Sequence, residues 1–461
     1  MTTNLKRREF LRMSTGTLLS TAMLSTMGGL QRVLAATADS SGYKALVCLY
    51  MTGGNDGFNW IVPQTAAAYS NYASVRTNLA LPASSLLNLN GAAGDGNVYG
   101  LHPACPELQA LFNSGKAAIL GNVGTLIAPT TPAQARAGSV AVPPQLFSHI
   151  DQSTQWQTSI PNSPLRYGWA GRIADLYTAQ GADPVLSMNI NIGGANYWQQ
   201  GATTNPYVVG INGAAILNDT NNSSYRGGLR QQAAASILKL ASADSNLMVA
   251  QMAAIQTSAA SKVGTVNKAY SAAGDLTTKF PALNQDNNLG MQLHQVARLI
   301  KAQSQIGDTR QIFFVNLGGF DTHQNQLIGQ ATLLPVISQN IHAFWLAMGE
   351  IGMQNNVTLF TASDFGRTLT SNGSGADHAW GNHHMIVGGA VQGGKYYGKM
   401  PSLKIGGSDD LGNTNGQMVP TTSTDQYAAT LAAWFGVSSS YLPTLFPNLG
   451  NFATSNVGFM G

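Results

Sequence analysis

Short, continuous apolar runs that stop at Gly, Asn or Asp recur along this chain. Residues 44–51 read Lys-Ala-Leu-Val-Cys-Leu-Tyr-Met and end at Gly-Gly-Asn-Asp-Gly, and similar runs occupy 117–123, 310–317 and 356–362. A fifth, less regular run covers 385–391. Apolar runs without alternation are typical of strands that are covered on both faces of a parallel sheet.

Between these strands the apolar residues follow helical spacing. The pattern predicts helices within 103–116, over 327–351 and over 424–435, the last with Ser423 or Thr424 as N-cap. Alternation of strands and helices predicts an α/β fold, with a mostly parallel central sheet and helices on both faces.

The segment from about 162 to 288 differs from its surroundings in composition. It is rich in Asn, Gly and Ala and contains one long Ala-rich helical stretch over 229–268. We interpret it as an insertion or cap on a single domain that spans 39–461.

The first 38 residues have the layout of an export signal. Lys6-Arg7-Arg8 precede Phe10-Leu11, a mildly apolar stretch follows over 13–30, and small residues end the segment. This order is typical of a twin-arginine signal peptide. We expect the twin-arginine translocase as a partner during export and a mature protein in the periplasm or outside the cell, without stable membrane insertion.

Charge is scarce in the rest of the chain. Only 10% of the 461 residues are charged, against about a quarter in an average domain. Removing residues 1–38 leaves 24 − 5 = 19 basic and 20 − 1 = 19 acidic side chains, so the formal charge of +4 belongs to the leader. A neutral body gives no electrostatic reason to expect nucleic acid or an anionic membrane as a partner.

The two cysteines, Cys48 and Cys105, are too few for a disulfide scaffold. They either pair in an oxidising compartment or remain buried free thiols.

Polar side chains follow three of the predicted strands. Asp56 comes after the first strand, Asp321 and His323 after the run at 310–317, and Asp364 after the run at 356–362. Carboxyl ends of parallel strands meet at one edge of a sheet, where ligands usually bind. Carboxylates and imidazoles together suit divalent metals such as zinc or manganese. We therefore predict a metal site, with further ligands among His378, His383 and His384.

Each of these residues also has a purely structural interpretation. Asp56 and Asp321 are able to cap helices, and Asp364 is able to pair with Arg367. His383 and His384 fit one buried and one exposed imidazole beside a strand.

The motifs that carry these residues resemble a known family. In chain order they are Gly-Gly-Asn-Asp-Gly, Leu-His-Pro-Ala, Ser148-His149 with Asp151, Gly-Gly-Phe-Asp-Thr-His ending at His323, Ser-Asp-Phe-Gly-Arg-Thr ending at Thr368, and Gly-Asn-His-His ending at His384. This order resembles the exported bacterial family catalogued as domain of unknown function 1501. That family is grouped with alkaline phosphatases and sulfatases, which implies an alkaline phosphatase-like α/β sandwich and a two-metal esterase site.

The resemblance also implies roles for individual residues. Asp56 matches the superfamily's first Asp, Asp321 with His323 its Asp-and-His pair, Asp364 the next Asp, and His383 or His384 the late His. Phe365 stands where a metal-binding His is usual, so His378 would have to replace that ligand from a neighbouring loop.

The nucleophile and the oxyanion contacts are less defined. Ser148 precedes a helix-like stretch and is either the nucleophile or an ordinary N-cap. Arg367 or His149 is expected to hold the non-bridging oxygens of a substrate.

These observations predict an exported metal-dependent hydrolase that acts on phosphate or sulfate esters, including envelope-derived ones. One or two zinc, manganese or calcium ions would serve as cofactor. The alternative is a catalytically inactive member of the fold that serves as a secreted binding or envelope-associated protein. A single, purely structural ion is a third interpretation.

Overall fold

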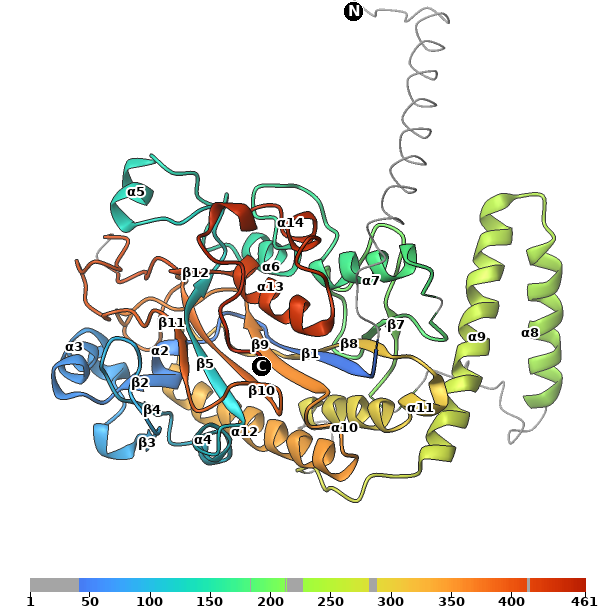
Figure 1. Ribbon diagram of the computed structural model, residues 1–461, viewed down its shortest axis with the longest axis horizontal. Helices are drawn as coiled ribbons and strands as arrows, with labels where there is room; N and C mark the ends of the chain where they lie inside the picture. Colours follow the sequence, from blue (N-terminus) through green and yellow to red (C-terminus); the bar gives the residue numbers. More distant parts are fainter. Residues whose placement is uncertain (1–40, 183, 212, 214–226, 282–287, 413–414) are drawn as a thin grey trace, which may run out of the picture.

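The computed structural model describes residues 41–182, 184–211, 213, 227–281, 288–412 and 415–461. The predicted signal peptide at 1–38 lies outside the described residues. Near the middle of the chain, two long helices extend from the body as a hairpin (Figure 1).

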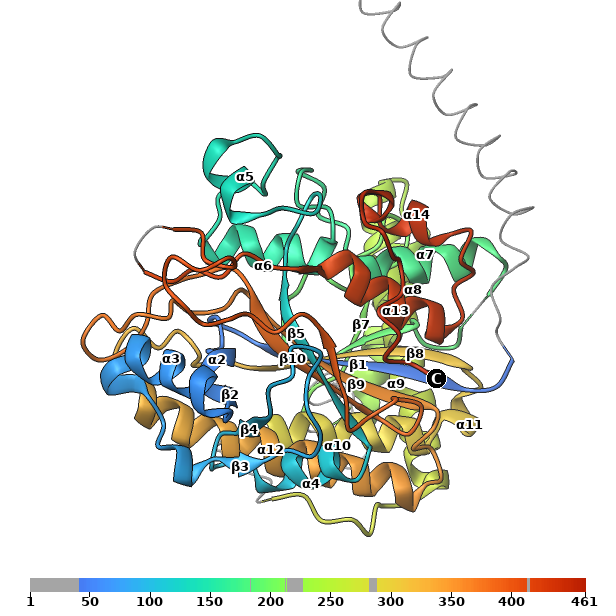
Figure 2. The ribbon, with the colours of Figure 1, turned by 60° about the vertical axis from the view of Figure 1, so that its left-hand side comes forward.

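A central sheet crosses the body, and helices cover both of its faces (Figures 1 and 2). The strand order is β11-β5-β10-β9-β1-β8-β6-β7, with β12 beside β5. The pairings are parallel except for those of β10, which is antiparallel to β5 and β9. The strands are β1 Lys44–Met51, β5 Ala117–Gly124, β6 Asn189–Asn191, β7 Tyr207–Val208, β8 Arg310–Leu317, β9 Val357–Ser363, β10 Asn382–Gly388, β11 Tyr396–Gly398 and β12 Thr422–Ser423. The predicted α/β fold with a mostly parallel sheet is confirmed.

The helices form a layer on each face of this sheet. On one side lie α4 Pro106–Asn113, α10 Asn288–Lys301, α11 Gln303–Ile306 and α12 Gln326–Glu350. On the other lie α6 His149–Thr158, α7 Trp169–Ala179, α13 Thr424–Phe435 and α14 Leu442–Leu445. The remaining elements are α2 Gly57–Trp60, α3 Ala66–Arg76, α5 Pro132–Ala137, α8 Gly227–Ser242, α9 Leu247–Ala273, and a small sheet of β2 Ile61–Pro63, β4 Tyr99–Leu101 and β3 Leu87–Asn88.

Strand β1 supplies both cores through the alternation of its side chains. Val47 and Leu49 belong to the apolar cluster with α10 and α12. Leu46 and Cys48 belong to the cluster with α7 and α13. Both faces are therefore buried, which explains the continuous apolar run in the sequence. Cys48 and Cys105 are buried and unpaired, so the free-thiol interpretation is confirmed.

Several predicted boundaries differ from the observed ones. Strand β10 begins at Asn382, three residues before the predicted start at 385. The helical stretch predicted over 229–268 is two helices. Helix α8 ends at Ser242, and α9 begins at Leu247 with Asn246 as its N-cap. Helix α13 has the predicted bounds, and Ser423 caps it by accepting a hydrogen bond from the Gln426 amide.

Most of the predicted insertion at 162–288 is integrated into the body. Strand β6 pairs with β8 and extends the central sheet, and α7 packs on that sheet with Trp169 buried. In the described part of this segment, the α8–α9 hairpin projects from the body (Figure 1).

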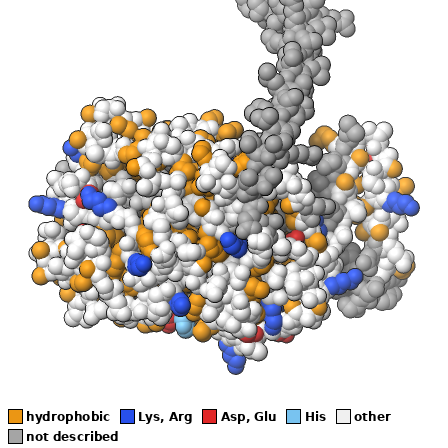
Figure 3. Space-filling view, in the orientation of Figure 1, with side chains coloured by type: hydrophobic (Ala, Val, Ile, Leu, Met, Phe, Trp, Pro, Cys, Tyr) orange, Lys and Arg blue, Asp and Glu red, His pale blue; other side chains and the backbone are white. Residues whose placement is uncertain are grey.

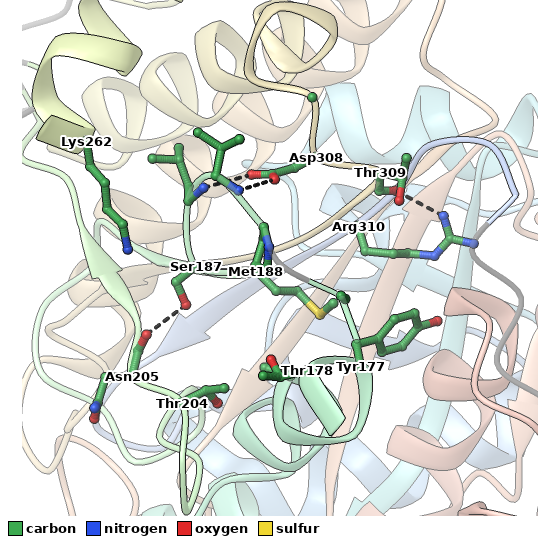
Figure 4. Close-up of a pocket in the computed structure, with 16 residues that line it drawn as sticks. Tyr177, Thr178, Ser187, Met188, Thr204, Asn205, Lys262, Asp308, Thr309 and Arg310 are labelled. Atoms are coloured by element: carbon green, nitrogen blue, oxygen red, sulfur yellow. Dashed lines mark hydrogen bonds between the residues drawn. The ribbon is translucent and has the colours of Figure 1, made fainter. Parts of the chain in front are cut away.

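A cavity of about 470 Å³ lies between α7 and α9, at the amino ends of β6 and β8 (Figure 4). Its charged groups include Asp308, which accepts hydrogen bonds from the amides of Val185 (3.0 Å) and Leu186 (3.3 Å). The Arg310 guanidinium donates to the Phe435 carbonyl at 2.8 Å. The hydrogen bonds of these two groups are made within the protein itself. The cavity lies at the amino ends of the strands, whereas the predicted metal ligands follow the carboxyl ends.

The buried carboxyl of Asp308 makes the free energy of unfolding depend on pH. Burial raises the pKa of this carboxyl from 3.8 to about 6, so the folded protein binds the proton more tightly than the unfolded chain does. The free energy of unfolding therefore includes a contribution of ~3 kcal/mol that is fully present below about pH 4 and is lost as the pH rises through 6.

In urea unfolding between pH 4 and 7, Asp308→Asn should remove this decrease of the free energy of unfolding with pH. Asp244→Asn, in the exposed loop between α8 and α9, is the matched control. Equal slopes for wild type and Asp308→Asn would contradict the prediction.

Candidate metal centre

Three neighbouring parallel strands, β9, β1 and β8, end at the same edge of the sheet. The loop after β8 carries Asp321 and His323, and the loop after β9 carries Asp364, Arg367 and His378. The first turn of α6 adds another imidazole to this edge. Polar side chains therefore lie together at the carboxyl ends of the strands, but the residues that do so are not all the ones predicted.

The centre of the site is formed by His149, Asp321 and His378. Each offers one ligand atom, and these atoms lie within 4.8 Å of one another. The Oδ1 atom of Asp321 is 3.4 Å from His149 Nε2 and 3.3 Å from His378 Nε2. Such a group is able to hold a divalent cation.

His323 lies beside this group. Its Nε2 atom is 3.2 Å from Asp321 Oδ1 and 2.8 Å from His378 Nε2. Three imidazole Nε2 atoms therefore approach one carboxylate oxygen. A set of nitrogen ligands with one carboxylate favours zinc or manganese over calcium, which prefers oxygen ligands throughout.

The opposite nitrogen of each of these rings is bound to an oxygen atom. Carboxylate and carbonyl oxygens only accept hydrogen bonds, so each Nδ1 donates, and each Nε2 is the atom directed to the centre, where it would ligate a bound cation. Such contacts orient metal-binding histidines in proteins. The acceptors are Asp364 Oδ2 for His149 at 2.7 Å, Asp377 Oδ1 for His323 at 3.0 Å, and the Phe147 carbonyl for His378 at 2.7 Å.

The backbone at Phe147 is unusual. Its φ of 71° lies in the left-handed region, which non-glycine residues rarely adopt. Its carbonyl accepts the hydrogen bond from His378. Local strain of this kind concentrates at functional sites.

The charges of the site act in different directions on its three ligand groups. Burial opposes ionisation of Asp321, but the hydrogen bond and charge of Arg367 outweigh it and lower the pKa to about 2. Burial lowers the pKa of His378, which favours the neutral ring that a metal requires. The hydrogen bond to Asp364 raises the pKa of His149, which favours the protonated ring, so a metal bound here would have to displace that proton.

Arg367 is completely buried, away from any substrate. Its guanidinium donates to the carbonyls of Gly54 (2.8 Å), Ala376 (2.9 Å) and Phe320 (3.0 Å), to that of Gly53, and to Asp321 at 2.6 Å. The sequence-based role of holding substrate oxygens needs free, exposed donors. The structure instead gives Arg367 the role of joining the loops after β1, β8 and β9.

Asp56 caps a helix and forms a buried ion pair. Its Oδ1 accepts hydrogen bonds from the amides of Phe58 and Asn59 at the start of α2. Its Oδ2 pairs with Arg76 and accepts from Gln326. None of these partners belongs to the histidine group, so the structure favours the capping interpretation over the metal-ligand one.

His383 and His384 are core residues. They are adjacent in β10, so their side chains point to opposite faces of the sheet. His383 accepts from the Asn122 amide at 3.1 Å, and His384 lies against Trp156 and Tyr427. Burial lowers the pKa of both to about 3, so both are neutral. The structure does not bring either of them to the histidine group.

Ser148 is the N-cap of α6. Its Oγ accepts from the Asp151 amide at 3.4 Å and donates to Asp151 Oδ2 at 2.6 Å. The cap orients the first turn of the helix, where His149 is located. Of the two interpretations of Ser148, the structure supports the capping one.

Asp364 serves as a positioning residue rather than a direct ligand. Its Oδ2 accepts from His149 Nδ1 and from the Gly53 amide at 3.2 Å. Its position after a buried strand marks Asp364 as a site residue in the sequence. The pairing with His149, 215 positions earlier in the chain, leaves no local pattern by which it could be predicted.

This geometry predicts separate effects for two buried aspartates. Asp364→Asn should weaken zinc binding by about 10- to 100-fold, because it weakens the hydrogen bond that orients His149. Asp56→Asn should leave zinc affinity unchanged while lowering stability, because Asp56 binds Arg76 and helix amides. Competition with a chromophoric chelator measures both affinities. Equal zinc affinities in the two folded variants would contradict this assignment. His383→Gln, which changes a core histidine outside the histidine group, is a second variant with which the zinc affinity of Asp364→Asn is compared.

Solved structures with similar chains are distant. The C-terminal periplasmic domain of EcEptC from Escherichia coli is 10% identical, with 91% of this chain and 87% of that chain covered and a TM-score of 0.35. Lipoteichoic acid synthase LtaP from Listeria monocytogenes is 7% identical (87% and 74% covered, TM-score 0.35). The PsFucS1 sulfatase from Pseudoalteromonas sp. is 12% identical (91% and 70% covered, TM-score 0.32). At these TM-scores the function has to be argued from the site itself.

Sequence comparison identifies the family. No protein of curated function matches the chain. The family described as protein of unknown function DUF1501 matches it over residues 43–438, which is most of its length. The chain therefore belongs to the DUF1501 family, as its motifs predicted.

Proposed function

We propose that this protein is an exported metal-dependent hydrolase of phosphate or sulfate esters, with one divalent cation bound between His149, Asp321 and His378. The single observation that carries the proposal is the arrangement of three imidazoles. Their Nε2 atoms approach Asp321 Oδ1, and each ring is bound from its far side by an oxygen acceptor. Imidazole rings that are oriented in this way by oxygen acceptors behind them are typical of metal sites.

The site is open to solvent on one side. The side chain of Asp321 is 49% exposed and that of His323 39% exposed, whereas Asp364 behind them is 3% exposed. Catalytic metal sites leave a coordination position for substrate, whereas structural ones are closed. A bound divalent cation supplies Lewis acidity, which polarises an ester oxygen and compensates the charge of an anionic ester.

The chain's own residues orient this chemistry. Asp364, Asp377 and the Phe147 carbonyl fix the imidazole rings, and Arg367 keeps Asp321 ionised. His323, at the exposed side, is the imidazole placed to contact a substrate or to move a proton. Because Ser148 Oγ is engaged in capping α6, we propose water as the nucleophile.

One ion fits the described residues better than two. The second set that the family resemblance implied depended on Asp56 and on His383 or His384. Asp56 is bound to Arg76, and the two histidines lie in the core on opposite faces of the sheet. One ligand group involving His149, Asp321 and His378 is found in the described part of the chain.

The alternative of an inactive binding protein rests on the ion pair of Asp321. Arg367 already donates to Asp321 Oδ1 at 2.6 Å, so the carboxylate is compensated without a metal. A protein that has lost its metal would keep this arrangement. Metal content therefore distinguishes the two functions.

Export is proposed from the leader at 1–38, with its Arg7-Arg8 pair. No helix among the described residues is long and apolar enough to cross a membrane. We propose a periplasmic or extracellular location.

Elemental analysis of untagged, exported protein should give one equivalent of zinc or manganese per chain. His378→Ala should lose that metal, and with it hydrolysis of para-nitrophenyl phosphate or sulfate, by at least ~100-fold. Wild-type protein without metal after incubation with both ions would refute the enzyme proposal and favour the binding protein.

Ser148→Ala separates a nucleophile from a cap. Loss of the cap should lower the free energy of unfolding by ~1 kcal/mol. The kcat should stay within a few-fold of wild type, because Ser148 Oγ binds Asp151. A loss of kcat of several orders of magnitude, with full metal content retained, would establish Ser148 as the nucleophile.

A further inference from the structure

The cavity of about 470 Å³ at the amino ends of β6 and β8 lies away from the metal centre (Figure 4). Its walls come from α7, from residues 184–188, 204–205 and 307–310, and from Lys262 on α9. The metal centre follows the carboxyl end of β8, so the cavity and the metal centre lie at opposite ends of this strand. Pockets of this volume hold small molecules in other proteins.

Three of the described residues that line the cavity carry a charge, namely Lys262, Asp308 and Arg310. The guanidinium of Arg310 is engaged by the body, because it donates to the Phe435 carbonyl at 2.8 Å and to the Gly42 carbonyl. Figure 4 shows this guanidinium on the side away from Lys262. The cavity therefore offers one cation and one carboxylate to a ligand.

The carboxylate of Asp308 is fixed in the wall. The amides of Val185 and Leu186 donate one hydrogen bond to each of its oxygen atoms, at 3.0 Å and 3.3 Å, and only 5% of the residue is exposed. Each carboxylate oxygen is able to accept a second hydrogen bond. Burial raises the pKa of this carboxyl to about 6, so the two amides do not fully compensate its charge.

Lys262 supplies the opposite charge. Its side chain extends from α9, and its ammonium group attracts the Asp308 carboxylate. In the part of the chain that the structure describes, the two groups form no ion pair, and no other acceptor binds the Lys262 ammonium. Charged residues make up only 10% of this chain and are thinly spread over the face in Figure 3. Two opposite charges that face one cavity without pairing are therefore available to a ligand.

The two charges determine the class of ligand. A simple anion would pair with Lys262 but would approach the Asp308 carboxylate, and a simple amine would meet the reverse conflict. A molecule that carries both an ammonium and a carboxylate group satisfies both walls. Pro184, Leu186 and Met188 add apolar surface, which suits the carbon chain between two charged ends.

We propose that this cavity binds a small zwitterion, either a free amino acid or a short peptide. The ammonium group of the ligand pairs with Asp308, and its carboxylate pairs with Lys262. The ligand thereby replaces the water around two charges that the protein leaves without an ion pair. Neither the metal centre nor its proposed reaction is needed for this binding.

Isothermal titration calorimetry of the mature protein at neutral pH tests this proposal. The probes are glycine, β-alanine, γ-aminobutyrate and ε-aminocaproate, which differ in the distance between their charges, and the dipeptide L-alanyl-L-alanine. At least one of them should bind with a Kd below ~1 mM, and the best probe distinguishes an amino acid from a peptide. Butyrate and n-butylamine, which carry one charge each, should bind at least ~10-fold more weakly than that probe.

Variants of Lys262 test the assignment of the carboxylate. Lys262→Met keeps the aliphatic part of the side chain and should weaken binding of the best probe at least ~10-fold. Lys268→Met, on the same helix but outside the cavity, is the matched control and should bind as wild type does. Lys262→Glu places a second carboxylate at the cavity, so this variant should bind the diamine putrescine more tightly than any of the zwitterions.

Two results would overturn the proposal. One is the absence of binding for all of the zwitterions at concentrations up to ~10 mM. The other is binding that Lys262→Met leaves unchanged, or that butyrate or n-butylamine reproduces with equal affinity, because a single charge would then suffice. Circular dichroism checks that each variant is folded, and metal content reports on the other site separately.

Discussion

The buried guanidinium of Arg367 joins the loops on which the site depends. These loops follow three adjacent strands, β1, β8 and β9, and Arg367 adds hydrogen bonds between them beyond the pairing of the strands. Arg367 is able to join the loops because the donors of its planar guanidinium point in different directions and reach carbonyls of all three loops. A buried cation is costly unless it is paired, and Asp321 supplies the opposing charge. The same ion pair keeps Asp321 ionised at the centre of the histidine group.

The residues around this ion pair divide into two kinds. His149, His323 and His378 present nitrogen atoms to the open side, and oxygen acceptors behind them fix each ring. This division explains why a carboxylate such as Asp364 is buried while Asp321 is half exposed. The rings gain their orientation from contacts that a substrate does not displace, so the site is organised before anything binds.

The sequence by itself determined the strands that are covered on both faces, since a continuous apolar run has few other solutions in an α/β fold. It therefore predicted the ends of β1 and β8 and the edge where Asp321, His323 and Asp364 gather. Only the tertiary structure decided which polar side chains point into the site. Asp56 turns to Arg76, and the earlier start of β10 places His383 and His384 on opposite faces. His149 and the Phe147 carbonyl join the group from a distant segment, and local sequence patterns do not encode contacts between residues more than 200 positions apart.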